Sequence, residues 1–71
     1  MIDEIMSLKK LYNHSLERYC NGCNYIMEHG EEADKWINML LSILEDMNIY
    51  LDEIEKTVDV SDDEKLNGFN V

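Results

Sequence analysis

The sequence predicts an all-α protein: an antiparallel two-helix hairpin with a short C-terminal helical turn, in which hairpins pair into a helical bundle. Three observations lead to this fold class. The 71 residues contain no proline and only three glycines, so little interrupts a helix. Apolar residues recur at steps of three and four in both halves, which is helical spacing. A short connection between the halves favours antiparallel packing. We expect the hairpin to span residues 1–58 and an acidic tail to span residues 59–71.

The first half predicts one long helix that ends at a glycine. Its inward side consists of Ile5, Leu8, Tyr12, Leu16, Tyr19, Cys23 and Ile26. Gly30 can adopt the left-handed conformation that closes many helices. Gly22 lies inside the helix, where glycine costs about 1 kcal/mol relative to alanine. We interpret Gly22 either as a point where another helix comes close or as a tolerated local kink.

The second half predicts a second long helix with a regular apolar side. That side consists of Ala33, Ile37, Leu40, Leu44, Met47, Leu51, Ile54 and Val58. Acidic residues in the first turn and Lys56 near the last turn complement the helix dipole. Each helix would contain about 25 residues and extend for about 38 Å.

The last residues predict a short capped helix. Ser61 and Glu64 have the spacing of a capping box, and Gly68 would end the helix after Asn67. Two interpretations of the apolar residues that follow stay open. The terminus could be frayed, as chain ends often are, or Leu66 and Phe69 could dock over the end of the hairpin or in a groove of a partner.

The apolar surface is wider than one hairpin can cover. The first helix has further apolar residues at Ile2, Met6, Leu11 and Cys20, and the second carries another row. The predicted oligomer interface is Trp36, Leu40, Leu41, Ile43, Met47, Tyr50 and Ile54. Leaving a large apolar side chain in water forgoes about 1.5–3 kcal/mol. We therefore expect a homo-oligomer, most simply a homodimer that forms a four-helix bundle. Burial on a different protein and a monomer with a folded-back tail are the alternatives.

The charge is concentrated in the second half of the chain. The net charge is −10, and residues 1–27 contribute none of it because three acids balance three bases. Such a field disfavours direct binding of nucleic acid or a membrane and favours a basic protein partner. The candidate acidic partner-binding face is Glu31, Glu32, Glu45, Asp46, Asp52, Glu53 and Glu55.

Two cysteines and two histidines form the array that most suggests a metal site. Cys20 and Cys23 are flanked symmetrically by His14 and His29, and zinc prefers thiolate and imidazole ligands. On one continuous helix, however, each histidine would lie about 9 Å along the axis from the nearer cysteine. We therefore expect no metal site and no cofactor, with the thiols packed as small apolar groups.

The sequence contains no recognisable catalytic motif. Adjacent carboxylates on a helix diverge by about 100° and do not converge on a substrate. There is no continuous apolar run long enough for a membrane span, and no signal-peptide pattern is apparent. We expect a non-enzymatic protein in the cytoplasm.

The segment from Tyr19 to Lys56, including Glu31–Lys35, and the ending Asp63–Phe69 resemble short acidic helical proteins of phages and mobile elements of Gram-positive bacteria. This resemblance implies roles such as inhibition of host defence, including anti-CRISPR activity, and anti-repression. Some such proteins imitate the charge of nucleic acid. We therefore expect an interaction module that inhibits a basic host protein. A metal- or ligand-dependent bundle using Cys20 and Cys23, or a structural subunit of a phage particle, is the alternative.

Overall fold

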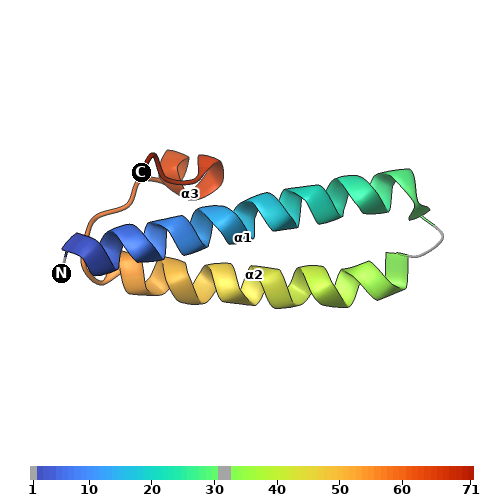
Figure 1. Ribbon diagram of the computed structural model, residues 1–71, viewed down its shortest axis with the longest axis horizontal. Helices are drawn as coiled ribbons and strands as arrows, with labels where there is room; N and C mark the ends of the chain where they lie inside the picture. Colours follow the sequence, from blue (N-terminus) through green and yellow to red (C-terminus); the bar gives the residue numbers. More distant parts are fainter. Residues whose placement is uncertain (1, 31–32) are drawn as a thin grey trace.

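The computed structural model describes residues 2–30 and 33–71 and contains three helices within them. Helix α1 spans Ile2–Glu28, α2 spans Ala33–Glu55 and α3 spans Asp62–Asn67. The two long helices lie side by side and run in opposite directions, and α3 lies against the N-terminal half of α1 (Figure 1). The molecule is elongated, with extents of 44 × 18 × 18 Å. The prediction of an all-helical chain with two long helices packed on each other is confirmed.

None of the helices in the described part of the chain has the length and apolarity needed to cross a membrane.

The core is a narrow strip between the two long helices, extended by the C-terminal tail. Its buried apolar side chains are Tyr12, Leu40, Ile43, Met47, Ile54 and Phe69. Ile54 is fully enclosed. The predicted inward residues of α1 are all at least half-buried, as expected, whereas Met6, Leu11 and Cys20 are exposed. Ile2 and Ala33 belong to α1 and α2, but their side chains are outside the part of the chain that the structure describes.

Helix α2 is rotated relative to the sequence-based prediction. Of its predicted inward side, Leu40, Met47 and Ile54 are buried, but Ile37 and Leu44 are exposed. The side that faces α1 is a different row, which we call the buried row. It consists of Trp36, Leu40, Ile43, Met47, Tyr50 and Ile54. The placement of Ile37 and Leu44 in the core was therefore wrong.

Two contacts near the linker explain this rotation. A Cβ atom built on Gly22 would lie 2.5 Å from Cδ2 of Leu40, so the missing side chain makes room for Leu40 against α1. One turn away, the rings of Tyr25 and Trp36 lie 4.6 Å apart at 53°. A tilted aromatic pair adds to the free energy of simple burial. These contacts turn the bulkier row of α2 towards α1 and support the reading of Gly22 as a close crossing point.

The ends of the long helices differ in detail from the prediction. Gly68 is the only glycine with a positive φ among the described residues, so Gly30 does not close α1 through a left-handed conformation, and that expectation was wrong. The residue after α1, His29, still donates its backbone N–H to the Tyr25 carbonyl, at 2.8 Å. Helix α2 ends at Glu55, three residues before the predicted end, and Val58 donates to the Ile54 carbonyl in the turn that follows.

The C-terminal tail, residues 59–71, is ordered and docked on α1. Ser61 Oγ accepts a hydrogen bond from the N–H of Glu64, so Ser61 caps α3 as predicted. Phe69 is buried and packs edge-on against Tyr12, with ring centroids 5.2 Å apart. Leu66 is 76% exposed. Phe69 therefore docks on the hairpin and Leu66 does not, and docking of Leu66 in a groove of a partner stays a prediction.

Candidate interaction surfaces

The residues predicted as an oligomer interface are mostly used inside the chain. Leu40, Ile43, Met47 and Ile54 are buried between α2 and the rest of the molecule, and Trp36 and Tyr50 are half-buried. Only Leu41, at 57% exposure, faces solvent. A buried side chain offers no surface to a second protein. Six of the seven residues of the predicted oligomer interface therefore belong to the contact with α1 or border it, and an interface between copies at this place stays a prediction.

The rotation of α2 leaves a different apolar surface uncovered. Ile37, Leu41 and Leu44 follow one another at steps of four and three, so they share one side of the helix. Their exposed fractions are 45%, 57% and 37%. We call these three residues the open stripe. Scattered surface leucines are normal in soluble proteins, whereas these apolar side chains are adjacent on one helix face, which makes the open stripe a candidate interaction surface.

Carboxylates border the open stripe. Asp34, Glu45 and Asp52 are exposed and lie about 60° around α2 from the stripe, at helical spacing. We call them the acidic edge. Asp46 and Glu53 are exposed farther around the helix, where Lys56 contacts Glu53 at 3.2 Å. Residues 33–55 carry six acidic side chains and one basic one, a net charge of −5. Glu31 and Glu32 of the predicted acidic face lie outside the described residues.

One member of the predicted acidic face is used within the chain. A carboxylate oxygen of Glu55 lies 2.5 Å from Nζ of Lys65, which ties α3 to the end of α2. The hydrogen bond to Glu55 raises the pKa of Lys65 above its usual value. Glu55 is therefore an anchor for the tail, and its charge is already paired before any partner binds.

The tail is held by a side chain that the sequence analysis did not single out. The amide of Asn13 accepts a hydrogen bond from the N–H of Phe69 at 2.6 Å and donates one to the Phe69 carbonyl. The Tyr12 hydroxyl donates to the carbonyl of Lys65 at 2.5 Å, and burial raises the pKa of this phenol. A polar residue on a helix gives no signal that it will bind a segment 56 residues away, so sequence reasoning missed Asn13.

The cysteines and histidines do not converge. Cys20 is exposed and Cys23 is half-buried, and both are free thiols. The His29 ring lies 4.4 Å from the Tyr25 ring, at the end of the aromatic row that includes Trp36. Within residues 2–30 and 33–71, no three metal-ligating side chains come together. The array is spread along α1 and beyond its end, as helical geometry requires.

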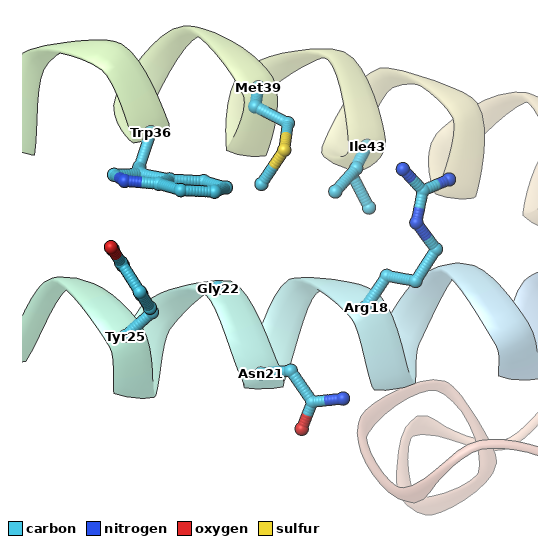
Figure 2. Close-up of a pocket in the computed structure, with 7 residues that line it drawn as sticks. All are labelled: Arg18, Asn21, Gly22, Tyr25, Trp36, Met39 and Ile43. Carbon is cyan, nitrogen blue, oxygen red and sulfur yellow. The ribbon is translucent and has the colours of Figure 1, made fainter.

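A shallow pocket of about 260 Å³ opens on one side of the contact between α1 and α2 (Figure 2). It is lined by Arg18, Asn21, Gly22, Tyr25, Trp36, Met39 and Ile43. In Figure 2, the Trp36 ring and Met39 reach towards α1, and Tyr25 points towards Trp36. Trp36 Nε1 is buried and has no hydrogen-bond partner among the described residues. The lining contains no carboxylate, imidazole or thiol, so the pocket offers mainly apolar contact, with polar groups from Arg18, Asn21 and Tyr25.

Comparison with protein-family models, curated proteins and solved structures gives no match for this chain. The resemblance to phage proteins therefore stays a prediction, and the functional argument depends on the surfaces described above.

Proposed function

We propose that this chain is a non-enzymatic protein–protein interaction module that uses the exposed side of α2 to bind a basic protein. The observation that carries the proposal is the combination, on one helix, of a net charge of −5 with an uncovered apolar stripe. Dense negative charge accelerates association with positively charged partners and selects against nucleic acid and anionic surfaces.

The resemblance to phage and mobile-element proteins extends this proposal to a biological role. A basic surface of a host protein commonly serves to bind nucleic acid, and an acidic helix that occupies the surface would block that binding. We propose inhibition of such a host defence or regulatory protein in the bacterial cytoplasm as the role of the module.

Self-association into a four-helix bundle is the second candidate, and the exposed open stripe favours it. The two candidates respond oppositely to salt. Added salt screens the attraction between an acidic chain and a basic partner, but it also screens the repulsion between two acidic copies. Raising the ionic strength should therefore weaken the first interaction and strengthen the second.

A variant pair tests the proposed function. The first variant neutralises the acidic edge with Asp34→Asn, Glu45→Gln and Asp52→Asn. The control removes the same charge from exposed positions elsewhere, with Glu17→Gln, Asp59→Asn and Asp63→Asn. The probe is a fluorescent oligolysine peptide, and the readout is its anisotropy. Exposed ion pairs contribute up to about 1 kcal/mol each, so we expect about a tenfold to hundredfold loss of affinity for the first variant. Equal losses for both variants would contradict a specific role for α2.

A further inference from the structure

Helices α1 and α2 together form one apolar face. The C-terminal tail covers the half of this face near the termini and leaves the half near the linker open. Leu16 and Leu51 pack against the core cluster that contains Phe69. Seven residues are two helical turns, so Cys23 continues the side of α1 that carries Leu16, and Leu44 continues the side of α2 that carries Leu51. Nearer the linker, Cys20, Cys23 and Met27 on α1 therefore lie on the same face as the open stripe on α2.

The uncovered half of this face is accessible. Met27 and Cys20 are exposed, and Cys23 is half-buried, beside the exposed leucines of the open stripe. In Figure 1, α3 lies near the end of the molecule that holds the N-terminus, and the linker end carries no third helix. An occupant of the open half would extend the packing that the tail begins.

We infer that the open half of the face docks a basic amphipathic helix from a partner protein, with apolar side chains on the open stripe and lysines or arginines along the acidic edge. This inference rests on the proposed function and specifies the partner. The stripe needs an apolar occupant, and the carboxylates of Asp34, Glu45 and Asp52 need positive charges about 60° around the helix from it. An amphipathic helix presents both surfaces at this spacing.

Charge selects this occupant over a second copy of the chain. Each copy has a net charge of −10, and each α2 contributes −5 of it. Packing two such helices together through their open stripes would concentrate like charges, whereas a net charge far from zero keeps proteins apart. A basic helix would instead be attracted by the negative charge of α2.

A matched pair of substitutions on α2 tests the inference. Leu41→Gln changes the open stripe, and Ile49→Gln makes the same chemical change at an exposed position on the outer side of α2, where Ile49 is 53% exposed. The probe is a synthetic leucine–lysine amphipathic peptide of about 15 residues, roughly 22 Å long as a helix. A peptide of the same composition, scrambled to remove its apolar face, is the control ligand.

We expect Leu41→Gln to weaken binding of the amphipathic peptide about tenfold or more, because burial of one leucine contributes about that factor. Ile49→Gln should leave the affinity within about twofold, a typical result for a surface position outside the contact. The scrambled peptide should bind more weakly to the wild type. In the wild-type complex, Cys20 and Cys23 should react more slowly with iodoacetamide than in the free chain.

Two results would overturn the inference. One is an equal effect of Leu41→Gln and Ile49→Gln together with unchanged alkylation of the cysteines. This result would leave the proposed function intact, provided that neutralising the acidic edge still weakens oligolysine binding. The other is a purified chain that is dimeric and whose cysteines are protected without peptide, because a second copy would then occupy the face.

Discussion

Gly68 allows the tail to pass close to Asn13. Its φ of 83° falls where residues with a side chain are strained, and an added Cβ would lie 2.6 Å from Oδ1 of Asn13. Gly30 provides a natural comparison, because an added Cβ there would meet nothing within 4 Å and its φ is not positive.

Replacing each of these glycines by alanine should therefore affect stability differently. Gly68→Ala should destabilise the docked tail by about 1–3 kcal/mol through backbone strain alone. Gly30→Ala should be neutral or stabilise the chain by up to about 1 kcal/mol by restricting the unfolded state. Urea unfolding of both variants, followed by circular dichroism, measures the difference. Equal effects at the two positions would contradict the described path of the tail.

Asn13 is the second residue on which tail docking depends. Asn13→Ala removes both hydrogen bonds to Phe69, and an unsatisfied buried backbone group costs about 1–3 kcal/mol. We expect faster hydrogen exchange of the Phe69 amide and faster proteolysis after residue 58. Asn24→Ala, at an exposed position on the same helix, is the control and should change neither rate. Slow exchange of the Phe69 amide in Asn13→Ala would show that another contact holds the tail.

At the scale of elements, the docking of α3 should depend on alkaline pH. Burial raises the pKa of Tyr12 in the folded chain above its ordinary value of 10.0. The neutral phenol therefore contributes stability that is fully present below about pH 10 and is lost as the pH rises through the folded-state pKa. The pKa of Lys65 is also raised, by Glu55, so the loss of its charge weakens docking in the same alkaline range.

The chain contains four tyrosines, so an ultraviolet titration of the wild type alone reports all of them together. The difference between the titration curves of the wild type and Tyr12→Phe reports Tyr12 alone. Its midpoint should lie above pH 10, and the near-ultraviolet circular dichroism of the wild type should change over the same interval. A midpoint at or below pH 10 would show that the phenol is hydrated and the tail undocked.

The elements also show how far the sequence alone could predict this structure. Periodicity identified both long helices, and Ser61 and Gly68 identified the bounds of α3, because these signals are local. The rotation of α2 could not be predicted, since two overlapping apolar rows share Leu40, Met47 and Ile54. The choice between the rows depends on Gly22 and on the Tyr25–Trp36 pair, whose contacts join residues distant in sequence.

The candidate site was predictable in its charge but not in its apolar part. Carboxylates on the outer side of α2 follow from the sequence, and the described members of the predicted acidic face are exposed. The position of the exposed apolar surface could not be predicted because it depends on the rotation of α2. The row that the sequence assigned to a partner lies against α1, and Ile37 and Leu44 face solvent. The pairing of Glu55 with Lys65 could not be predicted because it requires the folded tail.

At the scale of the whole molecule, the tail takes the place that a second copy could otherwise fill. Phe69 belongs to the same buried cluster as Tyr12, Met47 and Ile54, so one chain encloses its own core near the termini. Phe69→Ala should therefore expose the cluster and destabilise the chain by about 3–5 kcal/mol. Thermal unfolding measures this loss. Leu66→Ala is the control, because Leu66 is exposed, and an equal loss of stability there would contradict the docked arrangement.

We propose that a single chain completes its core with its own tail and keeps the exposed side of α2 free for a partner. Sedimentation equilibrium of the purified protein, over a wide range of concentrations and at both low and raised ionic strength, distinguishes this arrangement from a dimer. We expect a mass of 8.4 kDa that does not change on dilution. A mass of twice that value that persists at the lowest concentration would show that a second copy covers the face assigned to a basic helix.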